Sequence, residues 1–170
     1  MKKVTNQINI RKAKQSELAK IMEIYAYARK IMKDNGNATQ WGNNRPDIAT
    51  IQKDIEQQQL YVVEQQNAIH AVFAFVLGED PTYRVIEDGQ WQDNSEYGTI
   101  HRVASNGTIR GIFDLIMQFC EQKIKHIRID THKDNTIMQH LIEKHQFQRC
   151  GIIYVSDKTP RIAYEKSEKI

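Results

Sequence analysis

The clearest chemical pattern in this sequence lies where an apolar run passes through a glycine-containing turn into a helical pattern. The first backbone N–H groups of a helix have no partner within it, and the helix dipole places partial positive charge there. Such a junction can therefore bind an anion. Arg110 adds a forked, charged donor suited to phosphate. The alternative is an ordinary strand–turn–helix joint whose glycines serve only its geometry. The segment comprises Val103, Ala104, Ser105, Asn106, Gly107, Thr108, Ile109, Arg110, Gly111 and Ile112.

Several histidines gather between His126 and His145 and raise the question of a metal site. On one helix His140 and His145 would diverge by about 140°, because each residue turns the helix by about 100°. They therefore do not supply two ligands on one face, and we predict no metal. His132 follows an apolar segment, where ligands often bind at the edge of open sheets. A loop-capping role is the alternative for His132.

Trp41 and Trp91 lie in irregular segments rather than on the apolar stripe of a helix. Aromatic side chains on loops beside a cleft often line substrate pockets. Both tryptophans are therefore pocket candidates, with simple anchoring of their loops as the alternative. Cys120, by contrast, lies on a helical apolar stripe and is interpreted as a core residue rather than a nucleophile.

The hydrophobic pattern predicts the elements that position these residues. Residues 9–14 predict a strand, and Ser16 offers an N-cap for a helix with apolar residues from Leu18 to Met32 at helical spacing. Turn chemistry around Gly36 ends this helix. Pro46 suits the first turn of a second helix. The second helix carries Ile48, Ile51 and Ile55 on one side.

An antiparallel hairpin and an alternating second half complete the expected fold. Two apolar runs separated by three polar residues predict the hairpin, and the polar stretch 78–96 after it is a connection of a length that is usually functional or mobile. Alternating strands and helices build parallel pairing with right-handed crossovers. We therefore predict a mixed α/β fold, antiparallel at its start and partly parallel later. The segments are strands 60–64, 69–77, 99–104, 127–131, 152–155 and 162–164 and helices 109–123 and 137–142.

The composition is that of a packed globular protein, with 40% hydrophobic and 26% charged residues in 170. That length suits one domain. A net charge of +3 without a basic block predicts no nucleic-acid partner. The longest apolar run, 68–77, is too short to span a membrane, and residues 1–12 lack the apolar run of a secretion signal. Two cysteines form neither a disulfide framework nor a zinc motif, so we expect a soluble, cytoplasmic protein.

The order of these elements and three short motifs resemble the GCN5-related N-acetyltransferase (GNAT) superfamily over nearly the whole chain. The motifs are Ile100-His101-Arg102-Val103-Ala104 before the loop, Gly111 entering a helix, and Asn135 opening a helix that closes with Glu143-Lys144-His145-Gln146-Phe147. The resemblance implies one domain over residues 1–170. It also implies a mostly antiparallel sheet with one splayed parallel strand pair and helices on both faces.

The resemblance further implies that acetyl-CoA is the cosubstrate. Main-chain atoms of Val103 and Ala104 would meet its pantetheine arm, and residues 106–111 would wrap its pyrophosphate. Asn135 would lie near the far end of the cosubstrate. The activity implied is direct transfer of the acetyl group to a primary amine of a small molecule or peptide, without an acyl-enzyme.

Several positions depart from the family's pattern. Thr108 stands where the loop signature has Gln or Arg, and Phe113 where it has a small residue. The tyrosine that protonates the departing thiolate is replaced by Leu141 or Ile142, and the glycine of the closing motif by Gln146. These departures motivate an alternative function, a catalytically degenerate GNAT-fold protein that binds CoA or a metabolite as a sensor.

A base is expected beside the thioester, because an acceptor ammonium must lose a proton before it can attack. His101 is the candidate, and strand alternation puts it and Arg102 on opposite faces. A structural role for His101, Glu79 or Asp80 as the base, and a water chain are the alternatives. The candidate acceptor-binding residues are Trp41, Glu79, Trp91 and His132. Because many relatives form dimers, a homodimer is a further expectation, and a protein-interaction domain is the third functional alternative.

Overall fold

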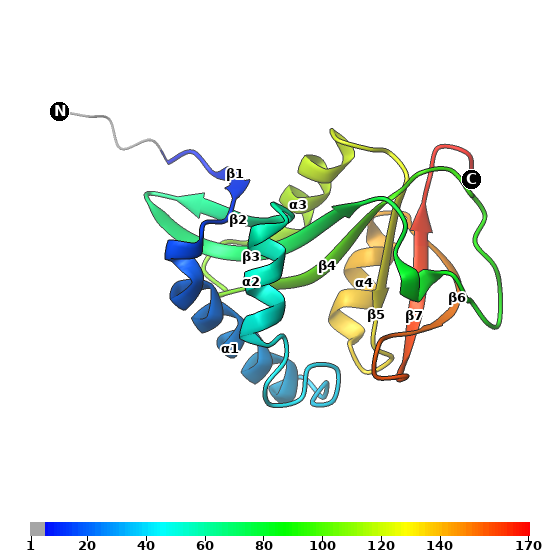
Figure 1. Ribbon diagram of the computed structural model, residues 1–170, viewed down its shortest axis with the longest axis horizontal. Helices are drawn as coiled ribbons and strands as arrows, with labels where there is room; N and C mark the ends of the chain where they lie inside the picture. Colours follow the sequence, from blue (N-terminus) through cyan, green and yellow to red (C-terminus); the bar gives the residue numbers. More distant parts are fainter. Residues whose placement is uncertain (1–5) are drawn as a thin grey trace.

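A seven-stranded sheet organises the chain in the computed structural model, which describes residues 6–170 (Figure 1). Across the sheet the order is β1-β2-β3-β4-β5-β7-β6. The β4–β5 pair is parallel and the other neighbouring pairs are antiparallel, which confirms the predicted mixed α/β class with one parallel pair. The strands are β1 (Asn9–Lys12), β2 (Leu60–Gln65), β3 (Ala68–Leu77), β4 (Gly98–Ser105), β5 (Ile127–Thr131), β6 (Gln148–Tyr154) and β7 (Pro160–Lys166).

Helices cover both faces of the sheet, as predicted (Figure 1). The first two helices pack on one face, where Ile21, Tyr25 and Ile51 are buried against residues of β2 and β3. The other two pack on the opposite face, where Ile116 and Ile142 join the larger apolar core. Within residues 6–170 no helix is long and apolar enough to cross a membrane. The helices are α1 (Leu18–Asp34), α2 (Ile48–Glu56), α3 (Ile112–Glu121) and α4 (Thr136–Lys144).

The long connection between β3 and β4 is a packed cover over the β6–β7 side of the sheet. A short 3₁₀ turn, Pro81–Tyr83, begins it. Tyr83 and Tyr97 are buried against Ile153 and Ala163, on the face opposite α3 and α4. This connection therefore covers β6 and β7, as α1 and α2 cover the other half of the sheet.

Both predicted helix starts in the first half are wrong in detail. A 3₁₀ turn, Gln15–Glu17, precedes α1, and α1 begins at Leu18 without a side-chain cap from Ser16. Pro46 lies before α2 rather than in its first turn, because Asp47 is the N-cap and its carboxylate accepts from the Thr50 N–H at 2.8 Å. Asp47 satisfies a free N–H at the helix start, which a proline cannot do.

Other boundaries shift for local reasons. Ile48 is exposed, whereas Ile51 and Ile55 are buried as predicted. The third helix starts at Ile112 instead of 109, because Gly111 is left-handed with φ 71° and interrupts the helical path. The strands of the last hairpin, β6 and β7, are longer than their apolar cores suggested.

The end of α4 holds a non-glycine residue in a conformation that favours glycine. Gln146 has φ 67°. Its N–H donates to the Glu143 carbonyl at 2.9 Å and the Phe147 N–H donates to the Ile142 carbonyl at 3.4 Å. This is a Schellman cap, in which glycine is favoured at the left-handed position. The closing-motif position where the resemblance expects glycine therefore keeps the glycine-type backbone.

We expect Gln146→Gly to raise the free energy of unfolding by about 1 kcal/mol, because it removes the steric cost of a Cβ in the left-handed region. Urea unfolding followed by circular dichroism measures this change. Gln146→Ala is the matched control and should bring no such gain, because alanine keeps the Cβ. A gain as large for alanine as for glycine would contradict the strain argument.

Candidate active site

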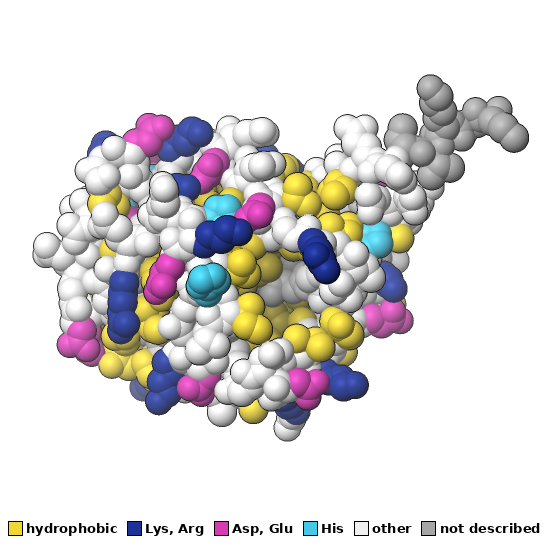
Figure 2. All heavy atoms as spheres, turned by 180° about the vertical axis from the view of Figure 1, so that it is seen from behind, with side chains coloured by type: hydrophobic (Ala, Val, Ile, Leu, Met, Phe, Trp, Pro, Cys, Tyr) yellow, Lys and Arg dark blue, Asp and Glu magenta, His cyan; other side chains and the backbone are white. Residues whose placement is uncertain are grey.

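A cleft of about 750 Å³ opens where β4 and β5 separate. The two strands pair only through Gly98↔Ile127, Thr99↔Arg128 and Ile100↔Ile129. Beyond Ile100, residues of both strands line the cleft, together with parts of α1, α4 and the segment between α1 and α2. The molecule is hollowed on the face shown in Figure 2, and hydrophobic side chains line much of the hollow. The predicted splay of the parallel strand pair is therefore present.

A bulge in β4 shapes the floor of the cleft. The pairing of β4 with β3 skips between Val72↔Ala104 and Ala74↔His101, so β4 carries one extra residue there. Arg102 lies in this bulge with φ 52°, and its carbonyl accepts from the Tyr25 hydroxyl at 2.8 Å. Arg102 pairs with Asp54 of α2 at 2.8 Å. His101 shares the face of its partner Ala74, which packs under α1 and α2.

The prediction that His101 and Arg102 face opposite sides of the sheet is therefore wrong. Regular strands alternate, but the left-handed residue in the bulge breaks the alternation. Both side chains are directed to the α1–α2 face, and both line the cleft.

His101 forms a short, largely buried contact with a carboxylate of the cleft. Its Nε2 lies 2.7 Å from Oδ2 of Asp80, and both side chains are largely buried. Burial tends to raise the pKa of Asp80, but hydrogen bonds from His101 and Thr82 and the charge of His101 outweigh it and lower this pKa to about 2. Asp80 therefore stays ionised near neutral pH and orients the imidazole. It is a poor base itself, because a base needs a pKa near the working pH.

Asp80 is held in place by the start of the long connection. Its other oxygen accepts from the Thr82 N–H at 2.9 Å, and its own N–H donates to the Tyr97 hydroxyl at 2.8 Å. Two of the candidate bases, His101 and Asp80, are thus one unit. The third, Glu79, pairs with Arg84 at 2.8 Å on the surface.

The loop between β4 and α3 has free N–H groups at the helix start. Gly111 is the N-cap of α3 and supplies no capping side chain. Among the described residues, the backbone N–H groups of 109–114 have no hydrogen-bond partner. Gly107 has φ 77°, and a Cβ there would lie 3.1 Å from the Tyr27 hydroxyl oxygen. This helix start is exposed, carries the charge of Arg110 and has unpaired backbone N–H donors. Such an arrangement is suited to binding phosphate groups.

The rest of this loop is tied to itself and to β3. The Asn106 side chain accepts from the Thr108 N–H at 3.2 Å, and the Ser105 hydroxyl accepts from the Gly107 N–H at 3.1 Å. Nδ1 of His70 lies 2.6 Å from the Thr108 hydroxyl. The predicted residues that line the cleft itself are Val103, Ala104, Ser105, Gly107 and Ile112, whereas Asn106, Thr108, Ile109, Arg110 and Gly111 form the adjoining loop.

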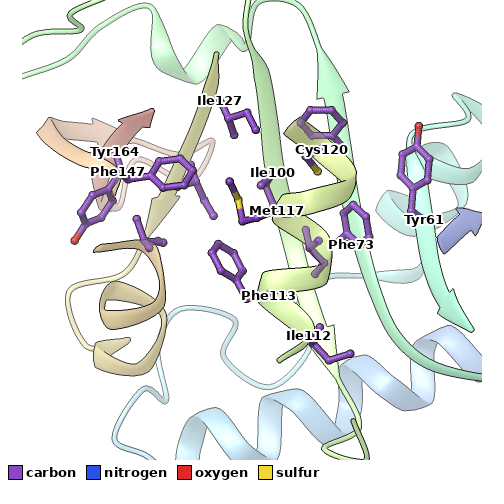
Figure 3. Close-up of a cluster of buried hydrophobic side chains, with 14 of the residues drawn as sticks. Tyr61, Phe73, Ile100, Ile112, Phe113, Met117, Cys120, Ile127, Phe147 and Tyr164 are labelled. Atoms are coloured by element: carbon purple, nitrogen blue, oxygen red, sulfur yellow. The ribbon is translucent and has the colours of Figure 1, made fainter. Parts of the chain in front are cut away.

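Phe113 is directed away from the loop and into the core. Phe113 is buried between α3 and α4 (Figure 3). Its ring meets His145 edge-on, with the ring centroids 5.2 Å apart. His145 is in turn bound to Asp114 at 2.6 Å. The bulky residue at this position therefore packs the helix pair and leaves the helix start open.

The other predicted residues fall into two groups. Trp41 lines the cleft and packs edge-on against Tyr25 at 5.6 Å, and Asn135 lines it while capping α4 through the Met138 N–H at 3.0 Å. Trp91 lies outside the cleft and covers the guanidinium of Arg128 at 4.0 Å. His132 also lies outside it and contacts the Thr39 hydroxyl at 3.2 Å, in keeping with a loop-capping role. Trp91, Glu79 and His132 are therefore not brought together with Trp41.

Two cleft residues are not among the candidate site residues predicted from the sequence. Asp130 is the second-last residue of β5 and accepts from the Tyr83 hydroxyl at 2.6 Å; its place near the end of a sheet strand is a signal that the sequence does carry. Arg161 begins β7 and had no local signal, since its role depends on a loop more than a hundred residues away. No group of His, Cys, Asp or Glu within residues 6–170 is arranged to hold a metal ion.

Comparison with solved structures identifies the superfamily. No family model matches the sequence, and no curated protein matches it. A GNAT-family acetyltransferase from Streptococcus agalactiae superimposes with a TM-score of 0.85 at 27% identity, covering 97% of this chain and 98% of that chain. The chain belongs to the GNAT superfamily.

Other GNAT-related structures share the fold at lower identity. A GNAT-family acetyltransferase from Listeria monocytogenes has a TM-score of 0.70 at 18% identity, covering 94% of each chain. The Salmonella typhimurium protein yncA, solved with its cofactor acetyl-CoA, has a TM-score of 0.58 at 14% identity and covers 95% of this chain and 94% of that chain.

This GNAT chain lacks the tyrosine of the later helix. Of the two residues that can stand in its place, Leu141 lines the cleft and Ile142 is fully buried in the core. Neither carries a proton donor. The cleft thus holds the His101–Asp80 pair, and it has an apolar residue at the position where the resemblance expects a hydroxyl.

Proposed function

We propose that the protein transfers the acetyl group of acetyl-CoA directly to a primary amine. The observation that carries this proposal is the His101–Asp80 pair, which lies at the point where β4 leaves β5 and a 750 Å³ cleft begins. GNAT membership supports acetyl transfer in general. The His101–Asp80 pair supports an amine as the acceptor, because an ammonium must lose its proton to a base before it can attack.

The residues of the cleft fit acetyl-CoA. Backbone groups of Val103 and Ala104 lie on the β4 segment that has left β5, so a pantetheine arm can pair with them. The unpaired N–H groups at the start of α3 and the exposed Arg110 suit the pyrophosphate. Asn135 lines the far side, although both ends of its amide already bond within the protein, to Gln40 and Met138.

The chain's own residues then divide the chemistry. Bound acetyl-CoA supplies the acetyl group as a thioester. With Asp80 ionised, Nε2 of His101 keeps its proton and donates a hydrogen bond to the carboxylate. Nδ1 is then the nitrogen that accepts the proton of the acceptor ammonium. A backbone N–H group near Val103 polarises the thioester carbonyl, as in an oxyanion hole. The amine then attacks directly, and the thiolate leaves without a tyrosine to protonate it.

A second candidate function rests on that missing tyrosine. Leu141 offers no proton to a departing thiolate, so a protein that binds CoA or a metabolite without turnover is the alternative. Release of free thiol from acetyl-CoA, measured with a panel of primary amines, separates the two functions. Turnover with any amine excludes the sensor, whereas tight binding without turnover supports it.

We expect acetyl-CoA to bind in isothermal titration calorimetry, and Arg110→Ala to weaken this binding about fivefold, the effect of one exposed charge contact. Arg149→Ala, an exposed arginine on β6, is the matched control and should leave binding unchanged. Absence of binding at millimolar acetyl-CoA would refute the proposed function. Equal effects of the two substitutions would refute the role of Arg110.

A further inference from the structure

Arg161 is a buried cation in the cleft, and among the described residues it has no carboxylate partner. Arg161 is 6% exposed and lines the cleft at the start of β7. Its hydrogen bonds go to neutral oxygens: Nη1 donates to the Thr159 hydroxyl and the Pro160 carbonyl at 3.0 and 2.8 Å, and Nη2 donates to the Gln40 carbonyl at 3.3 Å. Within residues 6–170 no carboxylate lies within ion-pair distance of this guanidinium.

The nearby acids are engaged elsewhere. Asp157 lies near Arg161 but is bound by Arg45 at 2.7 Å, and Asp130 accepts from the Tyr83 hydroxyl. Burial lowers the pKa of Arg161, although the charges of Asp130 and Asp157 act in the opposite direction. A buried charge is costly unless it is paired, so a guanidinium kept in this state beside a cleft is suited to an anionic group of a ligand.

The donors that remain on Arg161 suit a carboxylate. Three of its five N–H groups are used, which leaves the Nε–H and one N–H of Nη2. Arg102 uses the same two nitrogens, Nε and Nη2, to hold both oxygens of Asp54 at 2.8 and 2.9 Å. A forked contact of this kind is the preferred geometry for a planar carboxylate.

The opposite charge that a ligand amine needs lies on the same face of the sheet. Asp130 pairs with Ala163 in the β5–β7 ladder, so Arg161 is its diagonal neighbour, about 7–8 Å away along the ladder. Asp130 and the His101–Asp80 pair both line the cleft. The cleft therefore offers the carboxylates of Asp80 and Asp130 to an ammonium group, and the guanidinium of Arg161 to a carboxylate bound beyond Asp130.

The side of the cleft that Arg161 faces holds a further buried polar group. The Asn37 side-chain oxygen lines the cleft, and within the described chain it is buried without a hydrogen-bond partner. The Asn37 amide donates to the Gln40 side chain, and the Gln40 carbonyl accepts from Arg161, so Asn37 lies close to Arg161. Buried polar atoms are normally paired, so Asn37 points to a ligand with hydrogen-bonding groups rather than to an apolar amine.

We propose that the acceptor is an amino-carboxylate, such as an amino acid, and that Arg161 binds its carboxylate while the amine lies between Asp130 and His101. This inference rests on the proposed function, because it names the substrate class of the same site. Arg161 is thus a specificity-determining residue, placed across the cleft from the base.

The test compares paired acceptors, α- and ω-amino acids against their carboxamides and the alkylamines that lack the carboxyl group. We expect the carboxylate of the preferred amino acid to raise kcat/KM about 10²-fold over its amide, since losing a buried charged contact is costly. Arg161→Gln should abolish this preference while leaving acetyl-CoA affinity within twofold. Arg161→Lys should retain part of it. Arg149→Gln, which removes an exposed arginine of β6 outside the cleft, should keep the preference intact.

Equal rates for carboxylates and amides in the wild type would overturn the inference, and so would a preference that survives Arg161→Gln. If Arg161→Gln does not fold, the same comparison of amino acids with their amides is made with the wild type and with Arg161→Lys. Failure to acetylate any amine would instead refute the proposed function. Calorimetry of the same acid and amide pairs with the CoA-saturated protein then decides the inference alone: tighter binding of the acid supports it, and equal binding overturns it.

Discussion

His101→Ala is expected to lower the rate of acetyl transfer by about 10²- to 10⁴-fold, the usual contribution of a positioned general base. Acetyl-CoA affinity should stay within twofold, because the imidazole lies beside Asp80 rather than in the loop before α3. Steady-state kinetics with the best acceptor, together with calorimetry of acetyl-CoA, measures both quantities. The loss belongs to kcat and not to binding of the cosubstrate.

The nature of the acceptor sharpens this prediction. A base is needed only while the amine is protonated, so the deficit of His101→Ala should shrink as pH rises toward the pKa of the acceptor ammonium. An acceptor whose amine is already neutral at pH 7 should show little deficit. These two trends distinguish lost proton transfer from damage to the fold, which would lower the rate for every acceptor equally.

His140→Ala is the matched control for His101→Ala. His140 is an exposed histidine of α4, so its removal should leave kcat and the pH profile unchanged. A wild-type rate in His101→Ala would show that the proton leaves the amine by another route, such as the water chain considered from the sequence.

Periodicity in the sequence predicted most elements of the fold because each element buries one face. The apolar stripes of α1 and α3 and the runs of β3 and β5 are local signals, and the structure confirms them. Helix starts were less predictable, since a residue with capping chemistry does not cap every helix that follows it: Ser16 does not cap α1, whereas Asp47 caps α2. The bulge at Arg102 had no signal at all, because a left-handed arginine is held there by Tyr25 and Asp54 from other elements.

The candidate site was predictable only in its continuous part. The strand and loop that carry His101 and the α3 start are one stretch of chain, so their placement followed from the resemblance. The partner of His101 was not predictable as a partner, because Asp80 reaches it through an irregular connection. That connection also explains Trp91: it folds over β6 and β7, and its tryptophan covers Arg128 instead of the cleft.

The connection that carries Asp80 is pinned by a buried charge network around Glu165. The Glu165 residue is 0% exposed, and its carboxylate accepts from the Gln92 N–H at 2.7 Å, within the connection. The same carboxylate meets Nε2 of His126 at 2.7 Å and Nε of Arg128 at 2.9 Å. The Arg128 guanidinium also lies 4.0 Å from the ring centroids of Trp91 and Tyr97.

Glu165→Ala is therefore expected to lower the free energy of unfolding by about 3–5 kcal/mol, because it leaves the Arg128 guanidinium buried without its counter-ion. Chemical denaturation measures this loss. The matched control is Glu64→Ala, which breaks an ion pair with Arg11 of the same 2.9 Å length but with side chains 23% and 26% exposed. Its cost should be at most about 1 kcal/mol.

The pH dependence of this network has a definite sign. Burial tends to raise the pKa of Glu165, but the hydrogen bonds from His126, Gln92 and Arg128 outweigh it and hold the pKa below its ordinary value of 4.5. A carboxyl group with a depressed pKa stabilises the fold above its unfolded pKa and loses that contribution as pH falls. The stability gap between wild type and Glu165→Ala should thus narrow below pH 4.5. A gap that is constant across this range, or no larger than that of Glu64→Ala, would show that the network does not hold the connection and, through it, Asp80.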